Sequence, residues 1–257
     1  MMNTIKPSGF KSMDTLSFQP PIIAHRGASA YAPENTLIAF VKAAQLGIRW
    51  IECDVMQAAC GEAIIFHDET LDRTTNGKGY VERYPYTYLQ SLDAGSWFDP
   101  IFSGERIPTL RALLEFLQNT AMHANIEIKA LPGQEDALVK IVAKEIMTHF
   151  GERANNILFS SFSVAALYAL RRYLPHCQIG LLLHEWEADW EKTYDSLHCV
   201  SLHINHEIIF SYIAHQLKKD NKIVLCYTVN DPARATELYS FGVDAVFSDA
   251  PDRILII

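Results

Sequence analysis

The sequence predicts an α/β protein that folds as a (β/α)₈ barrel. Short apolar segments alternate along the chain with longer segments of helical periodicity, which is typical of a parallel sheet covered by helices. The 257 residues match the roughly 250 that eight strand–helix units usually need. Hydrophobic residues make up 49% of the chain and charged residues 20%, a composition that supports a buried core and excludes a disordered chain.

Nine segments have the short apolar character of strands. They are Ile22–Ala24, Trp50–Val55, Ala63–Phe66, Ala124–Ile128, Ile157–Ser160, Ile179–Leu183, Cys199–Ile204, Ile223–Thr228 and Ala245–Phe247. Between most of them, apolar residues recur at three- and four-residue spacing, which predicts helices over Glu34–Leu46, Asp136–Phe150, Val164–Tyr173, Ile208–Lys219 and Ala233–Phe241, with another beginning near Thr109. Gly47, Gly151 and Gly242 follow three of these helices, where glycine is favoured as a C-terminal cap.

Nine strands are one too many for a barrel of eight, and the second and third are the pair that must differ. Only seven residues lie between Val55 and Ala63, whereas a parallel crossover needs about a dozen or more. These two strands are therefore predicted to form an antiparallel hairpin that turns around Cys60-Gly61. In that hairpin we expect His67 to lie opposite Asp54.

The chain is expected to hold one barrel domain, residues 21–257, after a mobile lead-in of residues 1–20. Within the domain, the segment 68–108 lacks strand–helix alternation and is rich in Thr, Gly, Tyr and Asp. Long irregular segments in a compact domain are usually functional or disordered. We therefore interpret residues 68–108 as an insertion in the barrel.

Charge and cysteine usage exclude several classes of protein. A net charge of -8 repels nucleic acid at long range, so no nucleic-acid partner is expected. The five cysteines are odd in number and lack C-x-x-C spacing, which argues against a disulfide framework or a zinc site. We find neither the apolar core of a signal peptide nor a segment long enough to span a membrane, and therefore expect a cytoplasmic protein without a membrane anchor. The sequence leaves the oligomeric state open.

Carboxylates occur at two predicted strands in a pattern that points to a metal ion. Glu52 and Asp54 are two residues apart, so they share one face of a strand, and Glu127 and Lys129 repeat this spacing on the next parallel strand. In a barrel this polar face is the interior, near the C-terminal rim where active sites lie. Three crowded carboxylates need a counter-charge, and all-oxygen ligands favour Mg²⁺ or Ca²⁺.

Two histidines are expected to converge on these carboxylates. His25 and Arg26 close the first strand, and His67 follows the predicted hairpin. Histidine suits proton transfer near neutral pH, and a hard cation with nearby Arg26 and Lys129 would stabilise charge on phosphoryl oxygens. The residue types therefore indicate phosphate-ester chemistry. His203, near the end of a strand, is a candidate for lining the pocket, although a structural role is the simpler interpretation.

Several separate motifs resemble those of the glycerophosphodiester phosphodiesterase family, in its bacterial cytoplasmic form. They are His25-Arg26-Gly27, Pro33-Glu34-Asn35-Thr36, Glu52-x-Asp54, His67-Asp68, Asn125-Ile126-Glu127-Ile128-Lys129, Ser160-Ser161-Phe162, Tyr227-Thr228-Val229-Asn230 and Gly242-Val243-Asp244. The resemblance extends over about residues 21–250. It implies a barrel of the phospholipase-C-like phosphodiesterase type, with the insertion 68–108 capping one side of the active-site mouth.

The resemblance also implies an activity and residue roles. The activity is hydrolysis of deacylated phospholipids, such as glycerophosphocholine and glycerophosphoethanolamine, to sn-glycerol 3-phosphate and an alcohol. The implied roles are acid–base catalysis by His25 and His67, binding of one divalent cation by Glu52, Asp54 and Glu127, and binding of phosphate by Arg26 and Lys129. Asn35 is expected to brace the first loop, and candidates for lining the pocket are Asn35, Trp186, His203 and Tyr227. Many members have Trp where this chain has Tyr227, which leaves the headgroup preference open.

Two other functions and one mechanistic choice stay open from the sequence. A lysophospholipase D-like enzyme would need an apolar track at the mouth, for which Trp97, Phe98, Phe102 and Trp186 are candidates. A barrel kept only to bind a metal or phosphate would be expected to lose a histidine or carboxylate of the site, and all of them are present. The nucleophile is either the glycerol 2-hydroxyl, giving a cyclic phosphate, or water.

Overall fold

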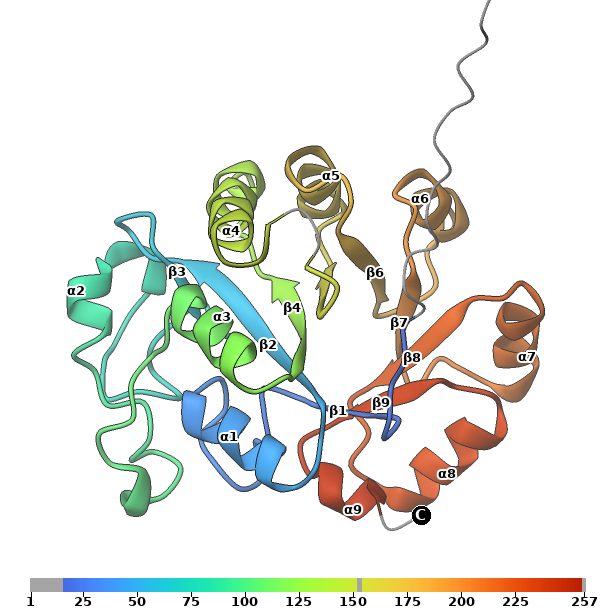
Figure 1. Cartoon of the computed structure of the whole chain (residues 1–257), viewed down its shortest axis with the longest axis horizontal. Coiled ribbons are helices and arrows are strands. Elements are labelled where there is room, and N and C mark those ends of the chain that lie inside the picture. Colours follow the sequence, from blue (N-terminus) through green and yellow to red (C-terminus); the bar gives the residue numbers. More distant parts are fainter. Residues whose placement is uncertain (1–15, 152–153, 256–257) are drawn as a thin grey trace, which may run out of the picture.

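A computed structural model describes residues 16–151 and 154–255 and has the predicted (β/α)₈ architecture (Figure 1). Within these residues, eight parallel strands close into a barrel in the order β1-β9-β8-β7-β6-β5-β4-β2, and β1 pairs with β2 to complete the ring. The barrel strands are β1 (Ile22–Ala24), β2 (Trp50–Gln57), β4 (His123–Ile128), β5 (Ile157–Ser161), β6 (Gln178–Leu183), β7 (Ser201–Asn205), β8 (Ile223–Tyr227) and β9 (Ala245–Ser248).

Helices surround the barrel, and an insertion extends from one side of it (Figure 1). The helices are α1 (Leu37–Gln45), α2 (Tyr86–Leu89), α3 (Leu110–Asn119), α4 (Glu135–Phe150), α5 (Val164–Tyr173), α6 (Trp190–Ser196), α7 (Ser211–Lys219), α8 (Pro232–Ser240) and α9 (Pro251–Leu255). Helix α1 begins three residues later than predicted, because Thr36 is its N-cap and its hydroxyl accepts a hydrogen bond from the Ala39 N–H. The short helix α6 was not predicted, since seven residues are too few to show periodicity.

The ninth strand, β3 (Ala63–Ile65), forms the predicted antiparallel hairpin with β2. The register differs by one residue from the prediction, because the loop between the paired residues Gln57 and Ala63 is centred on Cys60. The Phe66 N–H donates to the Asp54 carbonyl at 2.9 Å, so Phe66 and not His67 lies opposite Asp54. His67 is therefore the next residue beyond the paired strands.

The strands divide the apolar core into an outer and an inner part. Ile51, Cys53 and Val55 of β2 pack outward against the helices, as their alternation with Glu52 and Asp54 predicts. The barrel interior is filled at its base by a second cluster that includes Ile23, Trp50, Leu158, Leu225 and Phe247. The carboxylates of Asp54 and Glu127 lie beyond this cluster, toward the C-terminal ends of their strands, where barrel enzymes carry their active sites.

The structure describes only the end of the predicted lead-in, residues 16–20, but the whole of the insertion, residues 68–108. Residues 1–15 of the lead-in lie outside the described residues. Its end is packed rather than mobile, because Phe18 is buried against Trp50 and the Trp50 indole N–H donates to the Ser17 carbonyl. The insertion has a small apolar core of its own, which contains Leu71, Val81 and Leu89, and this core packs on the hairpin.

Among the described residues, none of the helices combines the length and the apolar character that crossing a bilayer requires.

Candidate active site

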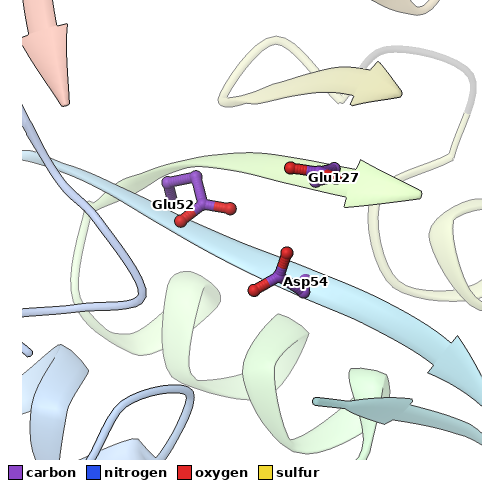
Figure 2. A group of neighbouring side chains, drawn as sticks. All are labelled: Glu52, Asp54 and Glu127. Atoms are coloured by element: carbon purple, nitrogen blue, oxygen red, sulfur yellow. The ribbon is translucent and has the colours of Figure 1, made fainter. Parts of the chain in front are cut away.

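Three carboxylates lie together inside the C-terminal end of the barrel. Glu52 and Asp54 belong to β2, and Glu127 belongs to the neighbouring strand β4, where it is paired with Asp54. Each offers an oxygen, and these oxygens all lie within 4.8 Å of one another. Figure 2 shows the carboxyl groups on the same side of the two strands, turned toward one another. Glu52 and Asp54 are buried, and Glu127 is partly buried.

The charges of these carboxylates make the cluster unfavourable without a cation. Burial, followed by the nearby charges of Asp54 and Glu127, raises the pKa of Glu52 well above its usual range. Burial and the charge of Asp54 raise the pKa of Glu127 to about 7. A divalent cation would remove this repulsion. The donor set, three carboxylates and so oxygen only, fits Mg²⁺ or Ca²⁺.

Two groups in the loop between β1 and α1 hold the carboxylates in place. The Arg26 backbone N–H donates to Glu52 Oε2 at 2.8 Å. The Asn35 amide donates to Asp54 Oδ2 at 2.8 Å, and its oxygen accepts from the Asp54 N–H at 3.2 Å. Asn35 does not line the cavity of about 230 Å³ that contains Glu52 and Glu127. The prediction of pocket lining is therefore corrected: Asn35 is a neighbour of the candidate metal ligand Asp54.

Two cationic side chains lie beside the carboxylates. Arg26 Nε is 3.5 Å from Asp54, and its Nη1 is 2.7 Å from Glu34. Lys129 Nζ is 3.7 Å from both Asp54 and Glu127. Arg26 and Lys129 are thus close enough to contact an anion held by a cation at these carboxylates.

His25 is held by a carboxylate that the sequence did not single out. Its Nδ1 is 2.7 Å from Asp249, which also accepts hydrogen bonds from Ser29 and Asn230. Burial alone would raise the pKa of Asp249, but these hydrogen bonds lower it to about 2. An ionised Asp249 requires a proton on Nδ1 of His25, which leaves Nε2, 3.9 Å from Glu52, for chemistry.

His67, in the loop after β3, is also paired with an aspartate. Its Nδ1 is 2.6 Å from Asp68, and Asp68 is also bound by Arg73. The hydrogen bond from Arg73 holds the pKa of Asp68 well below its usual range. Burial lowers the pKa of His67, and the charge of Asp54 and the hydrogen bond to Asp68 only partly oppose this effect. His67 is therefore biased toward the neutral form, with Nε2 unprotonated.

A cavity of about 230 Å³ joins these groups. Both histidines line it, as do Arg26, Glu52, Glu127 and Lys129, together with Asn125, Ser160, Phe162, Leu182, His203, Tyr227, Thr228 and Phe247. The structure thus places the predicted residues His203 and Tyr227 on this cavity. Tyr227 is fixed there by a hydrogen bond from its hydroxyl to the Leu183 carbonyl at 3.0 Å.

Trp186 does not line this cavity, contrary to the prediction. Its indole N–H donates to the Ile208 carbonyl at 3.2 Å, and its ring packs against Trp190. The reason is that α6 starts four residues after Trp186, at Trp190, and the two rings pack together against the outer apolar core.

Sequence reasoning missed Asp249 as a partner of His25, and Asn125 and Ser160 as lining residues. A usable signal existed for Asp249, because it directly follows β9 and so lies at the rim where parallel strands end. A signal also existed for Asn125 and Ser160. Side chains alternate along a strand, and both residues are on the strand face that points into the barrel.

Comparisons with known proteins agree with this geometry. Residues 25–253 match the model of the glycerophosphoryl diester phosphodiesterase family. A glycerophosphodiester phosphodiesterase of Caldanaerobacter subterraneus subsp. tengcongensis is 35% identical over 243 residues, which cover 91% of this chain and 96% of the relative.

Solved structures are similar as well. A phosphodiesterase of Oleispira antarctica, determined in complex with the product sn-glycerol-3-phosphate, matches with a TM-score of 0.89 and 37% identity, covering 92% of this chain and 96% of that chain. A glycerophosphodiester phosphodiesterase of Agrobacterium tumefaciens matches with a TM-score of 0.76 and 30% identity, covering 92% and 99%.

Proposed function

The chain belongs to the glycerophosphoryl diester phosphodiesterase family, and from this premise we propose that it hydrolyses glycerophosphodiesters to sn-glycerol 3-phosphate and an alcohol. The observation that carries the proposal is the cavity in which two aspartate-bound histidines adjoin a cluster of three carboxylates. The expected substrates are deacylated phospholipids such as glycerophosphocholine and glycerophosphoethanolamine.

Each charged group has a role in this proposal. Glu52, Asp54 and Glu127 would hold one divalent cation, Mg²⁺ or Ca²⁺. When bound, the cation supplies positive charge for the phosphoryl oxygens. Arg26 and Lys129 would bind the phosphate and neutralise the charge that develops in the transition state.

The two histidines would transfer the protons. One accepts the proton of the attacking hydroxyl on its Nε2, and the other donates a proton to the oxygen of the leaving alcohol as the P–O bond breaks. Asp249 and Asp68 stabilise the imidazolium that each histidine forms during the cycle. Either water or the glycerol 2-hydroxyl serves as nucleophile. A glycerophosphocholine analogue without the 2-hydroxyl separates the two, because full activity on it excludes the cyclic route.

The test is release of sn-glycerol 3-phosphate from glycerophosphocholine by the full chain, measured with Mg²⁺, with Ca²⁺ and with chelator. We expect release with at least one metal and loss of release with chelator. Equal release in all three conditions would contradict the metal requirement. No release from several glycerophosphodiesters with either metal would overturn the proposed function.

The lysophospholipase D-like alternative receives less support. The aromatic candidates Trp97, Phe98 and Phe102 pack on one another, and none of them lines the cavity. Lysophosphatidylcholine in the same assay is therefore expected to be a poorer substrate than glycerophosphocholine.

A further inference from the structure

Three buried polar residues form the part of the cavity wall that we call the floor: Asn125, Ser160 and His203. They come from β4, β5 and β7, and their exposed fractions are 2%, 0% and 0%. Asn125 lies two residues before Glu127 on the same face of β4, so it lies deeper in the barrel than Glu127, and Ser160 is paired with Glu127 on the neighbouring strand. Toward the base of the barrel, the same strand faces carry Leu158, two residues before Ser160, and the buried Ser201, two residues before His203.

The floor presents polar atoms for which the described residues supply no partner. The Asn125 amide donates to Ser160 Oγ at 3.0 Å, while Asn125 Oδ1 has no hydrogen-bond partner. His203 Nε2 is 2.9 Å from Ser201 Oγ, while His203 Nδ1 has none. Buried polar atoms are almost always hydrogen-bonded in native proteins. Both atoms belong to residues that line the cavity, so the cavity is where partners can be supplied.

The hydrogen bonds that are present fix what each atom can do. Burial lowers the pKa of His203 to about 3, so the imidazole is neutral. If the Ser201 hydroxyl donates to Nε2, both the hydroxyl proton and Nε2 are satisfied, and Nδ1 then carries the remaining proton as a donor. Asn125 Oδ1 is an acceptor, and the Ser160 hydroxyl, which accepts from Asn125, has its own proton to donate.

The neighbouring strand is adapted to the position of His203. A Cβ atom at Gly180 of β6 would lie 2.2 Å from His203 Nε2, so only glycine leaves room for this imidazole. Gly180 does not have a left-handed backbone, so its conformation alone does not require glycine. The position of His203 on β7 therefore depends on the residue that β6 places opposite it.

We propose that the floor is a hydroxyl-binding subsite that holds the glycerol end of the substrate. A glycerol hydroxyl can donate to Asn125 Oδ1 and accept from His203 Nδ1 or the Ser160 hydroxyl. An apolar group there would leave these atoms unpaired. The inference rests on the proposed function, and it adds an orientation: the glycerol lies inward and the leaving alcohol lies toward the mouth. The floor residues thereby select the ester bond that breaks.

Binding of two phosphate monoesters to the metal-loaded protein tests this assignment without turnover. The probes are sn-glycerol 3-phosphate and n-propyl phosphate, which lacks both hydroxyls, and their dissociation constants are measured by titration calorimetry. We expect the wild type to prefer glycerol 3-phosphate by roughly tenfold or more. S160A should reduce this preference severalfold, and N125L should remove most of it, with little change for n-propyl phosphate.

Ser161 provides the matched control. It is adjacent to Ser160 on β5 and equally buried, but its hydroxyl donates to the Ile128 carbonyl at 2.7 Å. S161A should leave the preference unchanged. Equal affinity of the wild type for the two probes, or an unchanged preference in S160A and N125L, would overturn the assignment. Failure of the proposed function would appear separately, as absence of glycerophosphocholine hydrolysis in the wild type.

Discussion

His25 Nδ1 lies 2.7 Å from Asp249 Oδ1, although 224 residues separate them in the chain. The contact exists because β1 and β9 are paired neighbours that close the barrel, with Ala24 opposite Ser248. The residues that directly follow these two strands therefore meet at the rim. Barrel closure thus completes one of the two histidine–aspartate pairs.

Replacing Asp249 should impair catalysis more than binding. In D249N the neutral amide no longer stabilises a protonated His25, so we expect kcat to fall by roughly 100-fold or more with a small change in KM. The matched control is D244N. Asp244 precedes β9, at the opposite end of the barrel, and pairs with Lys218. If D249N and D244N have the same kcat as the wild type, the role of Asp249 is wrong.

Each proposed acid–base histidine can be tested by a glutamine variant. H25Q and H67Q should each lower kcat by roughly 10²- to 10⁴-fold while the fold and metal binding persist. Steady-state kinetics and thermal unfolding with added metal provide the measurements. H215Q, at an exposed position on α7, is the control and should retain full activity. Substantial turnover by both H25Q and H67Q would refute the assignment.

Asn35 is expected to influence the affinity for the metal through Asp54. N35A removes both hydrogen bonds to Asp54, so the dissociation constant for the activating cation should rise by roughly 10- to 100-fold. Asn35 and the exposed Asn221 both have a left-handed backbone, with φ of 57° and 54°. N221A therefore introduces the same kind of backbone strain as N35A but does not remove the hydrogen bonds to Asp54. Equal metal affinities of the two variants would contradict a role for the Asn35 side chain.

The metal-free protein should become less stable as the pH rises from about 4.5 to about 7. Glu127 has a pKa of about 7 in the fold, above its ordinary value of 4.5. The folded state therefore binds more protons than the unfolded state in this window, and the free energy of unfolding falls with rising pH. Urea unfolding in chelator at several pH values measures this slope.

E127Q removes the titrating group, so its slope in chelator should be shallower than that of the wild type. Added Mg²⁺ or Ca²⁺ should stabilise the wild type most at the upper end of the window, because the ligands must be ionised to bind a cation. A wild-type slope equal to that of E127Q would show that Glu127 does not titrate there.

Replacing Gly27 by Ala should cost more unfolding free energy than the same change at another glycine with a similar backbone. Its φ is +82°, and a Cβ there would lie 2.7 Å from the Ala39 backbone in α1. Gly104 has a φ of +94° with nothing within 4 Å of such a Cβ. G104A should cost about 1 kcal/mol of unfolding free energy from backbone strain alone. G27A should cost about 3 kcal/mol or more.

Chemical denaturation of the two glycine variants measures these costs. Equal losses for G27A and G104A would mean that the close approach of Gly27 to α1 contributes nothing.

Local patterns in the sequence determined the barrel and the carboxylate cluster. Strand–helix alternation predicted the architecture, and the seven residues between Val55 and Ala63 predicted the hairpin. The two-residue spacing of Glu52 and Asp54 placed them on one face, because side chains of a strand alternate between faces. These features depend on neighbours in the chain, so periodicity and chain length are sufficient to predict them.

Tertiary structure alone decided which distant groups meet. The pairing of His25 with Asp249 depends on closure of the barrel, and the position of His203 over Gly180 depends on the register of β6 and β7. Trp186 was misplaced because its ring packs against Trp190 of α6 and the outer apolar core. Such contacts depend on how loops and neighbouring strands pack in three dimensions, which local periodicity does not specify. The sequence therefore predicted the faces of the strands, and only the packed barrel determined the partners on them.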